Sequence, residues 1–469
     1  MTTAAPDILV PSFDSPQRKS PLVVATFNLS ATIIGGGVLS LPYAFSKTGL
    51  LLGILLMVIA AVITERSLYL LCLCSRLTGA TTYGEVGEAA FGPWMEYFIS
   101  GVLGIFLVFV IIAYMVLAQD IWSSLVEIAA RLETPPNKEL VLVAIVILIS
   151  PFLVQGTLHA LRFNCYIGFS SVSILCLALV HHAWISTNNY ILWWSDDLED
   201  ILIAFPIITL SFLSIFNVLP IQNALLRPTR SRTLFAIDGA MLSCFVLTTI
   251  FGVAGFLFAG GATDGNILNN CDSSGSDMFL FLGKVGCGVT VVLAMPMMLL
   301  PCRASLLEVL DVLVNGPHKT PVEVEEEESE ALLKSGGHRK DNEYGSIEQN
   351  STNGDDATTG DQKRHDAKIS ITDNTVVHYV ATVSIVITCY MVAINVPGVA
   401  IVWSVIGCFM AYTLSFILPC ACYLKIQKRY PGHSLTSKTW VWFSWILLIA
   451  SVVASVACTF ETISRLLLV

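Results

Sequence analysis

Charged residues are scarce in this chain. They make up 13% of its 469 residues, against 55% hydrophobic residues, and the mean hydropathy is +0.73. This balance excludes a soluble globular domain, because too few charged side chains remain to cover a water-facing surface. Apolar runs near the ~20 residues that cross a bilayer occur at 22–45, 50–73, 97–117, 140–158, 166–184, 201–226, 234–259, 278–300, 376–393, 399–424 and 441–460. We therefore predict an all-α integral membrane protein with eleven transmembrane helices, in direct contact with the lipid bilayer.

Motifs for enzymatic or metal chemistry are absent as well. No aspartate pair, His-Glu-x-x-His sequence or Ser-His arrangement occurs at membrane depth, so we expect neither an enzyme nor a cofactor. Cys72 and Cys74, like Cys420 and Cys422, are two residues apart, and residues so spaced on a helix do not share a face. We expect no metal site, no disulfide and no nucleic-acid partner. Nothing resembles a repeated ion filter or a charged ring, which disfavours a channel.

Few ionisable residues fall within the apolar runs. Glu65 and Arg66 lie toward the inner end of the second run and are expected to pair locally. Asp238 lies one turn into the seventh run, and Lys284 lies near the outer end of the eighth. A charged group at mid-membrane would be a functional candidate, but none of these lies at the centre of its run. A proton relay through a central carboxylate is therefore not predicted.

Most of the 25 lysines and arginines lie in segments that are cytoplasmic if the N-terminus is cytoplasmic. An odd number of spans then places the C-terminus outside or in an organelle lumen. The first run lacks the cleavage site of a signal peptide. The chain divides into a disordered cytoplasmic N-terminus (1–20), helices 1–8 (21–313), a disordered acidic cytoplasmic loop (314–375), helices 9–11 (376–462) and a C-terminal tail (463–469).

Two short patterns in the acidic loop match signals that sorting adaptors bind. Glu328 precedes Leu332-Leu333 in an acidic dileucine pattern, and Tyr344 precedes Ile347 in a tyrosine-based pattern. Both are of the kind that endocytic and lysosomal adaptors recognise, although patterns this short also arise by chance. We expect the protein in the plasma membrane or in a vacuolar or lysosomal membrane.

The first and sixth runs are interrupted at matching places. Gly35-Gly36-Gly37 lie halfway along the first run, and glycine costs about 1 kcal/mol relative to alanine in a helix interior. The sixth run contains Ser211, Ser214, Asn217 and Pro220 where continuous apolar residues would be expected. An unwound backbone in a membrane is tolerated only where it faces protein, water or a solute. Two such spans in matching halves indicate the substrate site of a secondary transporter.

The broken helices offer the groups that an amino acid needs. We predict that the Gly36, Gly37 and Val38 amides bind a carboxylate, and that carbonyls near Ser211 to Ser214 bind an ammonium. The candidate substrate-binding residues are Thr32, Gly35, Gly36, Gly37, Val38, Ser211, Ser214 and Asn217, and the candidate ion-coupling residues are Asn28, Ser30 and Thr290.

Each of these features also has a purely structural interpretation. Glycine and serine are common at helix contacts in membranes, and Thr290 is more typical of a hydroxyl bonded back to its own helix. His181-His182, at the end of the fifth run, is read either as a pH sensor or as an interfacial pair, and the interfacial reading is favoured.

An ordered set of motifs resembles a known family. The set comprises Phe27-Asn28-Leu29-Ser30, Gly35-Gly36-Gly37-Val38-Leu39 with Pro42-Tyr43-Ala44-Phe45, Thr82-Tyr83-Gly84-Glu85-Val86-Gly87, Phe216-Asn217-Val218-Leu219-Pro220, Pro296-Met297-Met298 with Pro301-Cys302-Arg303, and Ile417-Leu418-Pro419. It resembles the amino acid/auxin permease family, which includes sodium-coupled neutral amino acid transporters and vacuolar amino acid transporters. The resemblance implies a LeuT-like fold with two inverted five-helix repeats and discontinuous helices 1 and 6.

The chain departs from the sodium-coupled branch of that family at two places. Ala31 stands where that branch usually has asparagine, and residues 291–295 lack its threonine. Both changes remove side-chain oxygens that a sodium ion would need, so proton coupling or exchange is favoured over sodium. We predict a secondary active transporter of small neutral amino acids that works by alternating access. The alternative is an amino acid sensor on the same scaffold that signals through its cytoplasmic loop.

Overall fold

The computed structural model describes residues 7–130, 136–154, 164–185, 191–271, 277–316, 375–430 and 438–468. Within these ranges the regular structure is helical, apart from one isolated bridge between Ser20 and Leu225. Nine described helices are long and apolar enough to cross a membrane, or ten if the bent pair Leu22–Ile33 and Gly36–Thr48 forms one span. The predicted all-α membrane class is therefore confirmed.

The helices overlap the predicted apolar runs, except for Tyr83–Phe91, which lies between two of them. The first half contains α1 (Leu22–Ile33), η1 (Gly36–Ser40), α2 (Leu41–Thr48), α3 (Leu50–Thr78), α4 (Tyr83–Phe91), α5 (Pro93–Ala130), α6 (Lys138–Val154) and α7 (Asn164–Ile185). The second half contains α8 (Leu198–Leu210), α9 (Ile215–Ala224), α10 (Arg230–Ala259), α11 (Met278–Asn315), α13 (Thr375–Ala393), α14 (Val399–Val405), η7 (Ile406–Ala411), η8 (Thr413–Ile417), α15 (Leu418–Ile426) and α16 (Lys438–Leu468). Because α6 is described over only 17 residues, the count of eleven spans stays a prediction.

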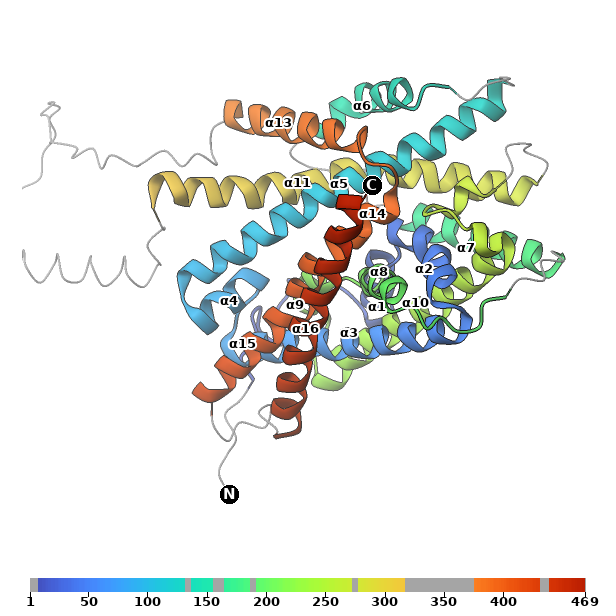
Figure 1. Cartoon of the computed structure of the whole chain (residues 1–469). Helices are drawn as coiled ribbons and strands as arrows, with labels where there is room; N and C mark the ends of the chain where they lie inside the picture. The colour runs from blue at the N-terminus through green and yellow to red at the C-terminus, as the bar shows by residue number, and fades with distance from the viewer. Residues whose placement is uncertain are drawn as a thin grey trace, which may run out of the picture.

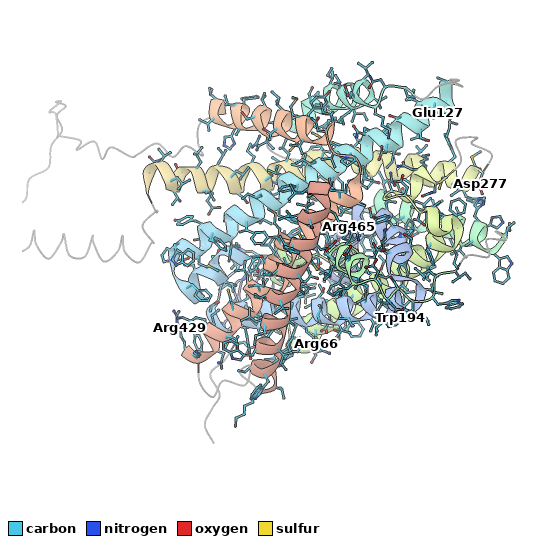
Figure 2. The ribbon with its side chains drawn as sticks, viewed as in Figure 1. Arg66, Glu127, Trp194, Asp277, Arg429 and Arg465 are labelled. Carbon is cyan, nitrogen blue, oxygen red and sulfur yellow. The ribbon has the colours of Figure 1, made fainter. Side chains whose placement is uncertain are left out.

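The two long helices α5 and α11 pack along each other through the middle of the molecule. In Figure 1, α6 and α13 lie on one side of this pair, and α3 and α16 lie on the other. The apolar stretch of α5 is 67% buried and has a mean hydropathy of 2.8, as expected for a helix that is hydrophobic on every face. Figure 2 places Glu127 and Asp277 toward one end of the bundle and Arg429 toward the opposite end.

Both predicted interruptions are present. The first span bends by 48° between Ile33 and Gly36. In the sixth, α8 ends at Leu210 and α9 begins at Ile215, so four residues separate the two halves. The predicted discontinuity of helices 1 and 6 is confirmed, and it brings two non-helical segments into the centre of the fold.

The N-terminal segment, for which the sequence predicts disorder, makes defined contacts over residues 7–20. The Asp7 carboxylate accepts hydrogen bonds from Arg76 Nη1 (3.2 Å) and Arg230 Nε (3.0 Å). Arg18 is 3% exposed, and its Nη1 donates to the Gln222 and Asn223 carbonyls, both at 2.9 Å. These carbonyls lie at the end of α9, where a helix leaves its last acceptors unpaired, so the segment supplies the donors they need.

The sorting patterns lie outside the described residues. Glu328, Leu332, Leu333, Tyr344 and Ile347 all fall between residues 317 and 374, and their role as adaptor signals stays a prediction.

Candidate functional site

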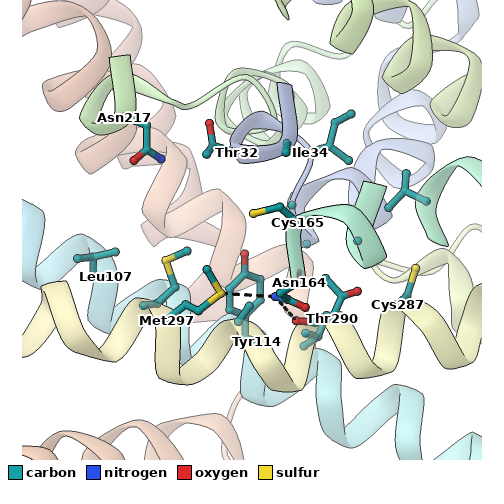
Figure 3. A pocket seen from close by; sticks show the side chains of 18 of the residues that line it. Thr32, Ile34, Leu107, Tyr114, Asn164, Cys165, Asn217, Cys287, Thr290 and Met297 are labelled. Carbon is teal, nitrogen blue, oxygen red and sulfur yellow. Dashed lines mark hydrogen bonds between the residues drawn. The ribbon is translucent and has the colours of Figure 1, made fainter. Parts of the chain in front are cut away.

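A cavity of about 430 Å³ lies where the two broken spans meet α5, α7 and α11 (Figure 3). Its wall contains Ala31, Thr32, Ile34, Gly35, Gly36 and Leu39 from the first span, Leu103, Leu107 and Tyr114 from α5, Asn164, Cys165, Gly168 and Val172 from α7, Phe216 and Asn217 from α9, and Cys287, Thr290, Val291, Ala294, Met297, Met298 and Pro301 from α11. None of these residues carries a charge. The volume falls within the ~300–1,000 Å³ that is typical of small-molecule sites.

The first break is held open by an extended backbone. Ile34 has φ −79° and ψ 90°, and Gly35 has φ −124° and ψ −164°, before the chain turns into the 3₁₀ helix at Gly36. None of these φ values requires glycine. Space is the constraint, because a Cβ on Gly36 would lie 2.7 Å from Tyr114 Cε1 and 2.9 Å from Leu117 Cδ1. Gly36 is therefore needed for the close approach of α5 to the break.

One of the three amides predicted to hold a carboxylate already has a partner. The Val38 amide donates to the Gly35 carbonyl at 3.2 Å. The Tyr114 hydroxyl lies beside the break, since a Cβ on Gly35 would be 3.3 Å from its oxygen. A carboxylate bound at Gly36 would therefore lie within reach of the Tyr114 hydroxyl.

The second break contributes less to the cavity. Ser211 is buried, and its Oγ donates to the Ile208 carbonyl at 2.7 Å. Ser214 is fully buried, and its Oγ has no hydrogen-bond partner among the described residues. Only the first turn of α9 reaches the cavity, through Phe216 and Asn217. The two serines therefore belong to the helix packing around the break.

The structure brings together part of the predicted site. Thr32, Gly35, Gly36, Asn217 and Thr290 line the cavity. Gly37, Val38, Ser211, Ser214, Asn28 and Ser30 do not. Hydropathy locates a span but not its rotation about its own axis, which is why residues chosen by position alone divide between the cavity and the packing around it.

The candidate ion-coupling residues do not converge on one point. Ser30 Oγ lies 3.0 Å from Ser243 Oγ and joins α1 to α10. Thr290 Oγ1 donates to the Gly286 carbonyl of its own helix at 2.8 Å. Asn28 is exposed and lies away from the cavity. A sodium ion needs several oxygen ligands at one place, and these three side chains are apart.

Sequence reasoning missed two polar residues of the cavity wall, Tyr114 and Asn164. Asn164 is 5% exposed, and its Nδ2 donates to the Thr290 carbonyl at 3.2 Å, which joins α7 to α11 (Figure 3). Its Oδ1 is buried and has no hydrogen-bond partner among the described residues. An unpaired buried amide oxygen is unusual, and a rotation of the side chain would offer it to a ligand in the cavity. A lone asparagine at the start of an apolar run was the signal that could have found it.

Comparisons with known proteins identify the family of the chain. The family described as "Transmembrane amino acid transporter protein" matches residues 18–465. Vacuolar amino acid transporter 7 of Saccharomyces cerevisiae is 25% identical over 457 residues, which cover 86% of this chain and 88% of that protein. Solute carrier family 38 member 10 of Homo sapiens is 23% identical over 450 residues, which cover 92% of this chain and 35% of that protein.

Solved structures show the same fold. One is Mhp1, a nucleobase-cation-symport-1 family transporter in a closed conformation with bromovinylhydantoin bound. Its TM-score is 0.55 at 11% identity, and the match covers 100% of this chain and 94% of that one. The inward-facing conformation of Mhp1 has a TM-score of 0.51 at 12% identity, covering 98% of this chain and 91% of that one. The predicted LeuT-like fold is confirmed. Because the family match spans nearly the whole chain, this protein belongs to the transmembrane amino acid transporter family, the amino acid/auxin permeases.

Proposed function

We propose that the protein is a secondary active transporter that moves small neutral amino acids by alternating access, driven by protons or by exchange rather than by sodium. The observation that carries the proposal is the uncharged cavity at the two helix breaks, which presents backbone at Gly36 together with Tyr114, Asn164 and Asn217. Paired breaks of this kind are where secondary transporters bind substrate.

The cavity lining supports a neutral substrate. The backbone at Gly36 and the Tyr114 hydroxyl can donate to a carboxylate, and Asn164 Oδ1 can accept from an ammonium. The remaining wall is mostly apolar, with Leu103 and Met298 among its residues. A charged substrate side chain would lose its hydration here without gaining a partner, which is costly. A neutral side chain loses little.

The side of the helix breaks on which the cavity lies supports alternating access. If the N-terminus is cytoplasmic, α1 and α9 are the inner halves of the two broken spans, and both line the cavity. On the opposite side of the breaks, Ser40 Oγ donates to the Gly265 carbonyl at 2.6 Å. This contact joins η1 to the segment between α10 and α11. The arrangement suits a state that is closed outside and directed inward.

A carboxyl pair between two spans supports proton coupling. Glu65 of α3 is 8% exposed and lies near Asp238 of α10. A proton on one of two neighbouring carboxyl groups removes the repulsion between their charges. Arg66 Nε lies 2.8 Å from Glu65 Oε2, which confirms the predicted local pair. The buried Glu65 Oε1 has no hydrogen-bond partner among the described residues, which suits a group that binds and releases a proton.

Transport in proteoliposomes tests the proposal. We expect purified protein to accumulate labelled alanine or leucine under an imposed pH gradient, with no response to a sodium gradient. Glu65→Gln should lose this accumulation but keep exchange of labelled for unlabelled substrate, and the exposed Glu139→Gln serves as the matched control. Accumulation driven by sodium would contradict the coupling. Saturable binding without flux would favour the alternative function, an amino acid sensor.

The names of the relatives support an organellar location. The two vacuolar transporters of S. cerevisiae and Schizosaccharomyces pombe are 25% and 24% identical to this chain. We propose a vacuolar or lysosomal membrane with a cytoplasmic N-terminus, reached through the loop signals at Leu332-Leu333 and Tyr344. Fluorescence microscopy of a tagged chain with Leu332 and Leu333 replaced by alanine tests the location, and retention in the same organelle would contradict a sorting role.

A further inference from the structure

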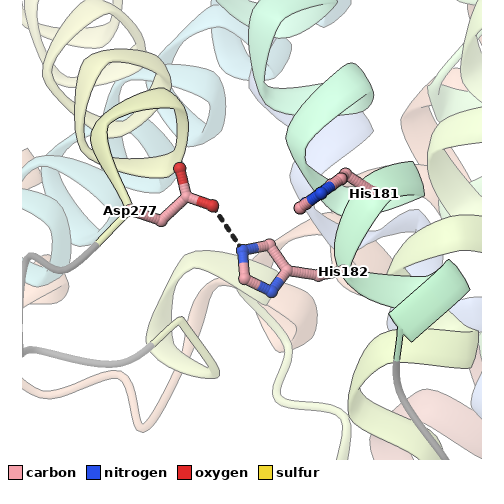
Figure 4. Close-up of side chains that lie close together, drawn as sticks. All are labelled: His181, His182 and Asp277. Atoms are coloured by element: carbon pink, nitrogen blue, oxygen red, sulfur yellow. Dashed lines mark hydrogen bonds and ion pairs between the residues drawn. The ribbon is translucent and has the colours of Figure 1, made fainter.

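Three potential metal ligands meet where α7 ends and α11 begins, away from the substrate cavity. His181, His182 and Asp277 each offer one ligand atom, and these atoms all lie within 4.8 Å of one another (Figure 4). The distance between His182 Nε2 and Asp277 Oδ2 is 2.6 Å. Among the described residues, no other group of three such side chains comes together in this way.

Surrounding contacts orient two of the three ligands. Asp277 caps α11, because its Oδ1 accepts from the amides of Phe279 (2.8 Å) and Leu280 (3.3 Å), which leaves Oδ2 for His182. The His182 ring packs edge-on against Phe258 of α10, with the ring centroids 5.8 Å apart. Supporting contacts of this kind are typical of metal sites, where they fix the ligands before the ion binds.

We propose that His181, His182 and Asp277 form a binding site for a divalent transition-metal cation, with Zn²⁺ the best match, and that the bound ion bridges α7 to α11. Two imidazoles and a carboxylate are a ligand set that zinc prefers, with a fourth position left for water. Calcium and magnesium favour oxygen ligands and fit less well.

The geometry needs only small movements to accept the ion. Tetrahedral zinc with bonds of about 2.0–2.1 Å separates its ligand atoms by roughly 3.4 Å. The 2.6 Å contact between His182 and Asp277 must therefore open, and the widest pair, which is at most 4.8 Å apart, must close by up to about 1.4 Å. His181 is exposed and its ring can rotate, while the ring planes of His181 and His182 stand 86° apart.

The carboxylate is available for an ion. Burial raises the pKa of Asp277, but the hydrogen bonds from His182 and from the Phe279 and Leu280 amides outweigh this and lower its pKa overall. The charged carboxylate is the form that binds a metal ion.

The bridge has a mechanical consequence. Asn164 of α7 and Thr290 of α11 both line the substrate cavity and are joined by a hydrogen bond. An ion that ties the far ends of these helices together restrains any motion of one against the other. We expect bound Zn²⁺ to slow exchange of substrate. This part of the proposal depends on the proposed transport function, whereas the binding of the ion does not.

Calorimetric titration of metal-stripped, purified protein with Zn²⁺ tests the site directly. We expect the full chain to bind one Zn²⁺ that a double variant, His182→Gln with Asp277→Asn, does not bind. Each single change should weaken binding at least ~10-fold, as loss of a metal contact does. Asp277→Asn keeps the oxygen that caps α11, so the variant isolates the ligand from the cap.

A matched control is available at another helix start. Asp197 caps α8 through Oδ1, which accepts from the Glu199 amide at 2.9 Å, and Asp197→Asn makes the same chemical change outside the cluster. It should bind Zn²⁺ like the unaltered chain. Equal binding by Asp197→Asn and Asp277→Asn, or no binding by the unaltered chain, would overturn the site. Slowing of exchange by Zn²⁺ that persists in His182→Gln would overturn the bridge.

Discussion

The two broken spans interrupt their helices at matching places but serve the cavity differently. At the first break the backbone itself lies in the wall, through Gly35 and Gly36, and α5 packs directly on it. At the second break the non-helical residues are buried in packing, and only Phe216 and Asn217 of α9 reach the cavity. The first break therefore presents peptide groups, and the second presents side chains.

This difference has a physical origin. Glycine lets another helix approach the backbone closely, whereas serine satisfies its hydroxyl on a nearby carbonyl of its own chain. Ser211 does this with Ile208, and it does not line the cavity. A pair of breaks in matching positions need not form a symmetric site.

The largest effect is expected at the first break. Gly36→Ala should lower the uptake kcat/KM about 30-fold, since overpacking by a methyl group costs about 2 kcal/mol and its Cβ would lie 2.7 Å from Tyr114. Gly37→Ala is the matched control, because its Cβ would meet only Ser211 Cα at 3.9 Å. Uptake is measured per molecule of protein in the membrane. Similar losses in both variants would show that the break needs glycine for another reason than the contact with α5.

A smaller loss is expected at the second break. Asn217→Ala should raise KM about tenfold, because a hydrogen bond to a buried polar ligand is worth roughly 1.4 kcal/mol. Ser214→Ala should leave KM unchanged, since it removes a buried hydroxyl that has no partner among the described residues. Concentration-dependent uptake measures both. A rise in KM for Ser214→Ala alone would show that the substrate contacts the non-helical residues of the second break and not Asn217.

A still smaller loss is expected at Asn164 in the cavity wall. Asn164→Ala should raise KM about fivefold, because it removes an acceptor for the ligand and costs about 1 kcal/mol. The Asn164 bond to the Thr290 carbonyl also disappears, so Asn164→Asp, which keeps the oxygen, separates the two roles. If Asn164→Asp raises KM as much as Asn164→Ala does, the hydrogen bond that Asn164 donates to α11 matters and its acceptor oxygen does not.

The smallest effect is expected at Thr290. Thr290→Val should change uptake by less than about twofold, because the hydroxyl bonds only to its own helix, where such bonds contribute little, and the valine keeps the methyl group that faces Gly168. The assay is uptake under the pH gradient. Loss of gradient-driven accumulation in this variant would restore Thr290 as an ion-coupling residue and weaken the case for the Glu65–Asp238 pair.

Much of the fold could be predicted because its signals are local. Most spans are continuous apolar runs, and a run of three glycines disfavours a helix whatever surrounds it. For the same reason the Glu65–Arg66 pair was predictable, since the two residues are adjacent. The contacts of residues 7–20 were not predictable, because Arg18 and Asp7 find partners that are distant in the sequence, on α3, α9 and α10.

The sequence by itself determined the membrane class, the positions of the spans and the two places where a helix must break. Tertiary structure alone decided which residues face the cavity. Packing of α5 on the first break brought Tyr114 to Gly36, and packing of α7 on α11 brought Asn164 to Thr290. The rotation of each helix is set by all of its neighbours together, and no pattern along a single span contains that information.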